Sequence, residues 1–258
     1  MTVVFETSGL FKTFGAVTAA ADINVAIEEG EMVGVIGSNG AGKTTFINMV
    51  TGYLKPSAGS IMFKGREMVG LAPREVTRAG ICRSFQIAQL FPELSVLDNV
   101  LIAYGISVEQ RLSFFRPLEN AESVDRARQI LEEYSIDGYM DAPVVTLPQG
   151  VRKLLDIAMA MLGRPSLLLL DEPTSGVAID DKFDLMETIM KAVRASGAAT
   201  LFVEHDMEVV ERYAPRVIAF YDGRVLADGP TQQVLSDPKV QEFVIGTQSK
   251  TGRKGSDA

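Results

Sequence analysis

The sequence has few residues of several kinds. Its 258 residues include one cysteine, one histidine and no tryptophan. A single cysteine, Cys82, excludes an internal disulfide, so nothing in the chain indicates an oxidising compartment. Basic residues are also in the minority, since 25 Lys and Arg against 33 Asp and Glu give a formal net charge of −8. Because binding to nucleic acid draws on basic groups that neutralise phosphates, this balance argues against a nucleic-acid partner.

Long apolar runs are absent as well. The run Leu167 to Leu170 is far shorter than the roughly 18 to 20 residues that a helix needs to cross a bilayer. The opening residues MTVVFETSGL lack the basic and apolar stretches of a secretory signal. We therefore expect a cytoplasmic protein that does not itself span a membrane. Its hydrophobic content of 47% is enough to fill the core of a large α/β domain.

The order of apolar patterns predicts an α/β core that is interrupted by a helical segment. Strand-like runs at Val3 to Phe5 and Ile23 to Ile27 predict a β subdomain, and an apolar strand at Glu31 to Ile36 leads into a glycine-rich loop and a helix. Helical spacing dominates from Ser95 to Gly163, after which strands and helices alternate again. Within a single domain, 1–258, the predicted parts are a core with its β subdomain at 1–90 and 164–248, a helical subdomain at 91–163, and a flexible tail at 249–258.

The glycine-rich loop satisfies the phosphate-binding pattern GxxxxGK(S/T). Backbone N–H groups and the start of the following helix meet the phosphates in such a loop, and Lys43 would reach the β- and γ-phosphates. The hydroxyl of Thr44 can bind Mg²⁺. The sequence therefore predicts ATP and Mg²⁺ as cofactors. The predicted nucleotide-binding residues of the loop are Gly37, Ser38, Asn39, Gly40, Ala41, Gly42, Lys43, Thr44 and Thr45.

Two later strands end in polar residues. Asp171 and Glu172 follow the apolar run LLLL, where Asp171 can hold Mg²⁺ through water and Glu172 can polarise the water that attacks the γ-phosphate. His205 follows the run Thr200 to Val203 and Glu204, and ligands gather at the carboxyl ends of parallel strands. Taken singly, a solvated strand end and a structural histidine are open alternatives. With the phosphate loop upstream, we expect Glu172 and His205 to be catalytic.

In this order the motifs resemble those of the ATPases of ABC transporters, over nearly the whole chain. Gly37 to Thr45 resembles the Walker A loop, Asp171 and Glu172 resemble Walker B and its catalytic base, and His205 resembles the H-loop histidine. The resemblance implies a RecA-like P-loop NTPase core with an N-terminal antiparallel β subdomain and an inserted α-helical subdomain. It also implies that Lys43, Glu172 and His205 act in ATP hydrolysis.

Three weaker matches complete the set. Gln86, in RSFQ, resembles the Q-loop glutamine, which implies a catalytic role and a place among the Mg²⁺ ligands. Phe14, in KTFG, resembles the aromatic residue that stacks on adenine. The run LPQGV, Leu147 to Val151, stands where the family has the signature LSGGQ. Taken alone, Gln86 would more readily be a surface amide and Phe14 a core residue.

The family works in pairs, which implies the partners of this chain. ATP is sandwiched between the Walker A loop of one subunit and the signature loop of the other in a head-to-tail dimer. The implied partners are a second ATPase subunit, transmembrane permease subunits and a solute-binding protein, with the chain peripheral on the inner face of the cell membrane. The signature residues that would face the partner's nucleotide are Pro148, Gln149 and Gly150.

Two departures fall on the surface that would complete the partner's site. Pro148 replaces a serine and Gln149 a glycine of the signature, and Ala178 replaces the usual aspartate of the D-loop, which here reads SGVA. Proline offers neither a hydroxyl nor a backbone N–H. We therefore hypothesise that the second ATPase subunit is not identical to this chain.

Among subfamilies, the chain is most similar to the ATPases of importers for branched-chain amino acids and their amide or urea relatives. The similarity lies in the opening SGLFKTFGAVTAAADIN, the run GVRKLLDIAMAM, the insertion near Leu101 to Leu118 and the ending ADGPTQQVLSDPKVQEFVIG. Three alternatives remain open: an export ATPase of the lipopolysaccharide type, a soluble ABC ATPase that acts on ribosomes or DNA, and a regulatory subunit with feeble hydrolysis.

Overall fold

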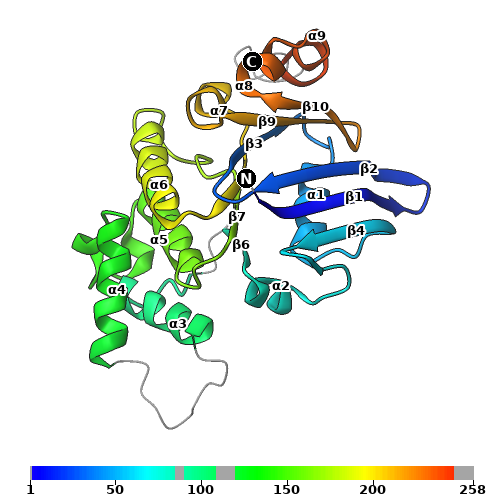
Figure 1. Ribbon diagram of the computed structural model, residues 1–258. Coiled ribbons are helices and arrows are strands. Elements are labelled where there is room, and N and C mark those ends of the chain that lie inside the picture. Colours follow the sequence, from blue (N-terminus) through cyan, green and yellow to red (C-terminus); the bar gives the residue numbers. More distant parts are fainter. Residues whose placement is uncertain (1, 85–89, 109–119, 247–258) are drawn as a thin grey trace. The chain divides into compact units, whose positions relative to one another are not determined.

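The computed structural model describes residues 2–84, 90–108 and 120–246, and its contacts divide the chain into two units (Figure 1). The first unit combines residues 1–79 with 199–258, and the second is residues 80–198. The second unit therefore contains a strand before residue 90 and a strand after residue 164 together with the helices. The predicted boundaries instead assign both of these strands to the α/β core. The predicted domain boundaries stay a prediction.

An antiparallel sheet forms the N-terminal part of the first unit. Strands β1 (Val3–Phe14) and β2 (Val17–Glu28) make a long hairpin beside β4 (Ala58–Phe63) (Figure 1). The sheet continues from β4 to the short strand β5 (Arg66–Glu67). Its buried face carries alternate apolar residues of the two long strands, as expected for a sheet with one covered side. The predicted runs at 3–5 and 23–27 are parts of these longer strands. The sequence pattern underestimates their length because polar residues on the open face interrupt the apolar alternation.

A second sheet in the first unit is mostly parallel. Strand β3 (Met32–Gly37) lies between β8 (Ala199–Val203) and β9 (Arg216–Tyr221), parallel to both, and β10 (Arg224–Pro230) runs antiparallel to β9. Every residue of β3 and β8 is buried, which is typical of parallel strands covered on both faces. The hairpin turn predicted at 222–223 is confirmed by positive φ angles of 46° and 72°.

Short helices complete the first unit. They are α1 (Lys43–Val50), α2 (Pro73–Ala79), α7 (Met207–Tyr213), α8 (Thr231–Ser236), α9 (Pro238–Val240) and a π-helical turn at Gln241–Ile245. The guanidinium of Arg216 joins the end of β2, the start of β3 and strand β10. It donates to Ala26 O at 2.9 Å, to Glu31 at 2.9 Å, and to both carboxylate oxygens of Asp228 at 2.7 Å.

The second unit is mainly helical and contains two parallel strands, β6 (Ile81–Ser84) and β7 (Leu167–Asp171). Its helices are α3 (Val96–Val108), α4 (Ala121–Glu133), α5 (Gln149–Met161) and α6 (Lys182–Ser196), with 3₁₀ turns at Asp137–Tyr139 and Val144–Thr146. The side chain of Asn120 caps α4 by accepting from the N–H of Ser123 at 3.0 Å. Within the described ranges, no helix is long and apolar enough to cross a membrane.

Candidate functional site

The phosphate loop lies between β3 and α1, in the first unit. Lys43 is the first residue of α1 and is only 6% exposed. Its ammonium group turns back over the loop and donates to the carbonyl oxygens of Gly37 at 2.6 Å and Ser38 at 3.0 Å. Asn39, Gly40 and Thr44 are exposed, Ser38 and Thr45 are half-buried, and Ala41 is buried. The loop thus brings an ammonium group, a helix start and exposed backbone together.

Gly42 explains why the loop requires glycine at this point. Its φ is +100°, a conformation that L-residues rarely adopt. A Cβ atom there would also lie 2.8 Å from Ala19 O and 3.1 Å from the Cα of Gly223. Strand β2 and the hairpin turn between β9 and β10 therefore press against the loop and fix its path.

His205 follows β8, the strand that pairs with β3 next to the phosphate loop. The N–H of Glu204 donates to Val35 O of β3 at 3.2 Å, so the ladder continues to the residue before His205. The N–H of His205 donates to the carboxylate of Glu204, which is 3% exposed, at 3.1 Å. Asp206 caps α7 by accepting from the N–H of Glu208 at 3.0 Å. Strand pairing and this cap therefore hold the His205 backbone near the carboxyl end of β3.

Phe14 ends β1 at the tip of the β1–β2 hairpin and is 52% exposed. The ammonium of Lys12 lies 5.2 Å from the centre of its ring. An exposed aromatic ring is not part of a core, so the open alternative of a core phenylalanine is wrong for this residue. Its neighbour Val17, across the turn, is 65% exposed. The hairpin tip thus presents apolar surface to solvent.

In the second unit, the two acidic residues of the β7 end have different surroundings. Asp171 is 8% exposed, and its carboxylate accepts a hydrogen bond from the guanidinium of Arg83 on β6. Glu172 is half-buried and has a φ of +49°, which is uncommon for a residue other than glycine. The ammonium of Lys153, on α5, donates to the carbonyl oxygen of Glu172 at 3.2 Å.

The altered signature begins helix α5. Pro148 is its N-cap and provides no side-chain hydrogen bond, whereas serine in that place could cap the helix. Pro148 and Gln149 are exposed, and Gly150 is half-buried. Gln149 lies close to the D-loop of the same chain, since a Cβ added to Gly176 would be 3.6 Å from Gln149 Nε2. A side chain larger than hydrogen at position 176 would therefore pack against Gln149.

The structure thus gathers the predicted site residues in two groups. The first unit holds the phosphate loop, His205 and Phe14, and the second holds Asp171, Glu172 and the altered signature. Gln86 lies outside the described residues. Arg83, Lys153 and Glu204 are neighbours of these groups that sequence reasoning did not select. The sequence signals for them were weak: Arg83 is a charged residue within an apolar strand, Lys153 lies on the apolar face of a helix, and Glu204 follows an apolar strand.

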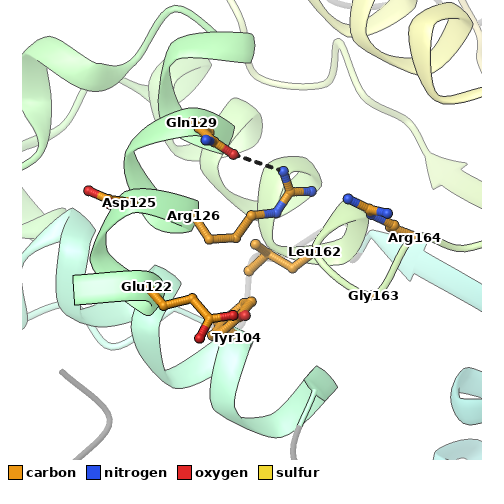
Figure 2. Close-up of a pocket in the computed structure, with 8 residues that line it drawn as sticks. All are labelled: Tyr104, Glu122, Asp125, Arg126, Gln129, Leu162, Gly163 and Arg164. Atoms are coloured by element: carbon orange, nitrogen blue, oxygen red, sulfur yellow. Dashed lines mark hydrogen bonds between the residues drawn. The ribbon is translucent and has the colours of Figure 1, made fainter. Parts of the chain in front are cut away.

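A separate surface pocket of about 770 Å³ lies in the second unit (Figure 2). It is lined by Tyr104 of α3, by four residues of α4, and by the segment that follows α5. None of its residues belongs to a predicted nucleotide motif. Its lining carries charges of both signs, from the carboxylates of Glu122 and Asp125 and the guanidiniums of Arg126 and Arg164.

A buried strand leads through a glycine-rich loop into a helix whose first residue is lysine, and further parallel strands end in polar residues. This arrangement defines a P-loop NTPase fold. The family model described as ABC transporter matches residues 20–175. The chain belongs to the ABC transporter family, as its ATP-binding, ATP-hydrolysing subunit.

Curated relatives match along nearly the whole chain. The probable branched-chain amino acid transport ATP-binding protein LivG of Archaeoglobus fulgidus is 35% identical over 95% of this chain and 96% of its own length. BraF of Pseudomonas aeruginosa, a high-affinity branched-chain amino acid transport ATP-binding protein, is 33% identical over 94% and 98%. LivG of Escherichia coli is 32% identical over 94% and 98%.

Solved structures agree with the fold. MJ1267, an ATP-binding cassette of an ABC transporter, in its ADP conformation, has a TM-score of 0.85 at 30% identity over 94% of this chain and 98% of that chain. A nucleotide-free cassette from an ABC transporter gives a TM-score of 0.83 at 30% identity, with the same coverage. The predicted ABC ATPase fold is therefore confirmed.

Proposed function

We propose that this chain powers an importer of branched-chain amino acids or related small solutes, by binding and hydrolysing ATP beneath transmembrane permease subunits. The observation that carries the proposal is the similarity to LivG and BraF, which extends over nearly all of both chains at 32–35% identity. The retained phosphate loop, with its buried Lys43, supports it. None of the relatives reported above is described as an export or ribosome-directed ATPase.

The proposed roles follow the two groups of site residues. Backbone N–H groups of the loop and the ammonium of Lys43 hold the β- and γ-phosphates, and Phe14 stacks on the adenine. Glu172 polarises the attacking water, and His205 binds the γ-phosphate. Gln86, which lies outside the described residues, is assigned to catalysis and metal binding by the family match alone.

The donor set fits Mg²⁺, which prefers oxygen ligands. The hydroxyl of the exposed residue Thr44 and the carboxylate of Asp171 are such donors, and Gln86 would add an amide oxygen. Bound Mg²⁺ would neutralise charge on the phosphate oxygens. Thr44 lies at the start of α1 and Asp171 at the end of β7, and the oxygen donors of both side chains support the proposed metal site.

The partners complete the proposal. The chain would pair head to tail with a second, non-identical ATPase subunit, on the inner face of the cell membrane, in a complex that includes a solute-binding protein. The exposed Pro148 and Gln149 would then face the partner's nucleotide. Pro148→Ser should raise the hydrolysis of the assembled complex, because it restores a hydroxyl that can cap α5 and meet a phosphate. No change in hydrolysis would count against this arrangement.

The central test uses two variants and a matched control. Lys43→Ala should abolish ATP binding in calorimetry, whereas Glu172→Gln should keep ATP binding and lower hydrolysis by about 100-fold or more. Glu187→Gln, on the exposed face of α6, carries the same charge change and should keep both activities. Cells with Lys43→Ala should lose leucine uptake, and the wild-type chain should copurify with its permeases. Leucine uptake that is undiminished in cells with Lys43→Ala would contradict the proposal.

The two ATPase sites can be compared in the same complex. Glu172→Gln in this chain and the corresponding change in the partner should lower hydrolysis to different extents, because the two composite sites differ in their signature residues. Equal losses from the two changes would contradict a non-identical pair.

A further inference from the structure

Arg83 and Asp171 form an ion pair on neighbouring parallel strands of the second unit. Nη2 of Arg83 donates to Oδ2 of Asp171, and the two side chains are only 12% and 11% exposed. Among the described residues, the carboxylate of Asp171 forms its hydrogen bond and ion pair with this guanidinium. The carboxylate that we propose as a Mg²⁺ ligand is therefore already paired, through Oδ2, with the positively charged side chain of Arg83.

Strand register makes the contact a consequence of the fold. Arg83 on β6 is the partner of Leu169 on β7, and Asp171 lies two residues further along β7. Residues two apart on a strand lie on the same face, so the long side chain of Arg83 reaches forward to Asp171. The planar guanidinium stays charged at any physiological pH and is well suited to a carboxylate.

Charge decides what the pair does to metal binding. A divalent cation and the guanidinium are attracted by the same carboxylate charge, and they repel each other across a few ångströms of partly buried space. Screening by solvent is weak for side chains this buried. Asp171 is therefore a poorer ligand for a free cation with Arg83 beside it than it would be alone. The phosphates of a nucleotide add negative charge that offsets this repulsion.

We propose that Arg83 is a positioning residue that reserves Asp171 for the metal–nucleotide complex, by serving as its counter-cation when no nucleotide is bound. The inference rests on the proposed role of Asp171 in metal binding. It adds that metal and nucleotide bind cooperatively and that the source of the cooperativity is a side chain on β6. Arg83 need not touch the nucleotide or the metal for this effect.

Manganese, detected by electron paramagnetic resonance, probes the pair without any hydrolysis. In the full chain without nucleotide, Arg83→Gln should tighten Mn²⁺ binding by about fivefold or more, because a cation next to the ligand has been removed. Arg83→Lys keeps the charge and should stay within about twofold of the wild type. Arg128→Gln, on the exposed face of α4, controls for net charge and should change nothing.

The outcomes separate this inference from the proposed function. With a non-hydrolysable ATP analogue, Asp171→Asn should weaken Mn²⁺ binding; if it does not, the proposed role of Asp171 fails. If Asp171→Asn weakens binding but Arg83→Gln behaves as the wild type, the inference about Arg83 alone is overturned. Should Arg83→Gln fail to fold, the double variant with Asp171→Asn leaves no uncompensated carboxylate. It should bind Mn²⁺ more tightly than Asp171→Asn, because the guanidinium that repels the metal is gone, and equal binding in the two variants would also overturn the inference.

Discussion

The ammonium of Lys153 donates a hydrogen bond to the backbone carbonyl of Glu172, across 3.2 Å. The same carbonyl accepts the N–H of Ser175 at 3.1 Å. Glu172 is held at a φ of +49°, a conformation that costs energy and persists only where its surroundings hold it. Lys153 is 4% exposed and lies on α5, just after the altered signature. The helix that begins with the signature is therefore bonded to the backbone of the residue proposed as the catalytic base.

Lys153→Met should lower both stability and turnover. The change removes one partner of the Glu172 carbonyl and should reduce the free energy of unfolding by about 1–3 kcal/mol, measured by urea denaturation. It should lower kcat more than it changes KM, because it loosens the backbone under Glu172 without touching the phosphate loop. Lys191→Met, at an exposed position of α6, should change neither quantity. An unchanged kcat in Lys153→Met would show that this bond has no part in turnover.

Gly42→Ala should destabilise the chain by about 2 kcal/mol or more. The new methyl group would meet Ala19 O at 2.8 Å, and the φ of +100° disfavours any L-residue. Gly40→Ala is the matched control, because Gly40 has a φ of +80° but no atom within 4 Å of the added Cβ. It should cost about 1 kcal/mol, from backbone strain alone. Urea denaturation measures both, and equal losses would contradict the close packing at Gly42.

The sequence was sufficient to predict the elements whose signals are local. The loop at 37–45, the fully apolar strand before Asp171 and the Asp222–Gly223 turn each depend on a few neighbouring residues, and the structure forms each of them. Strands β1 and β2 were predicted too short, because polar residues on their open face interrupt the apolar alternation that defines a strand.

Contacts between distant residues could not be predicted in the same way. Arg83 and Asp171 are 88 residues apart, and their contact depends on the register of β6 and β7, which no local pattern encodes. Lys153 reads as one polar residue in an amphipathic helix, and its partner is 19 residues further on. Both contacts involve charged side chains that are buried only after the strands and helices have packed.

Stability should fall above pH 9, in part because of Cys82. Burial on β6 raises the pKa of its thiol from 9.0 to about 11, since a thiolate is poorly solvated there. The unfolded chain loses this proton near pH 9 while the folded chain keeps it, so the contribution is complete below pH 9 and is lost as the pH rises towards 11. Between pH 8 and pH 10 the loss from this group should be about 1 kcal/mol.

Cys82→Ala isolates that contribution. The variant loses some packing at every pH, but its free energy of unfolding should decline less between pH 8 and pH 10 than that of the wild type. Urea denaturation at the two pH values gives the difference. Parallel declines in the two proteins would mean that the thiol ionises equally in the folded and unfolded chains.

Tyr134→Phe should leave the chain equally stable or more stable, by up to about 1 kcal/mol. Tyr134 follows α4 and is 0% exposed, yet its hydroxyl has no hydrogen-bond partner in the part of the chain that the structure describes. With no partner among the described residues, the hydroxyl loses hydration on folding without a matching hydrogen bond from them, a cost that phenylalanine avoids while keeping the ring in place. Tyr139→Phe, at a 39% exposed position, should have no effect on stability at neutral pH.

The alkaline range provides a second readout for Tyr134. Burial, and then the charge of Glu133, raise the pKa of its phenol well above the ordinary value of 10.0. The unfolded chain therefore ionises near pH 10 while the folded chain stays protonated, so this contribution is present below pH 10 and is lost above it. Tyr134→Phe should flatten the fall in the free energy of unfolding above pH 10. A variant that is less stable by more than about 1 kcal/mol at pH 7 would instead show that the hydroxyl is hydrogen-bonded in solution.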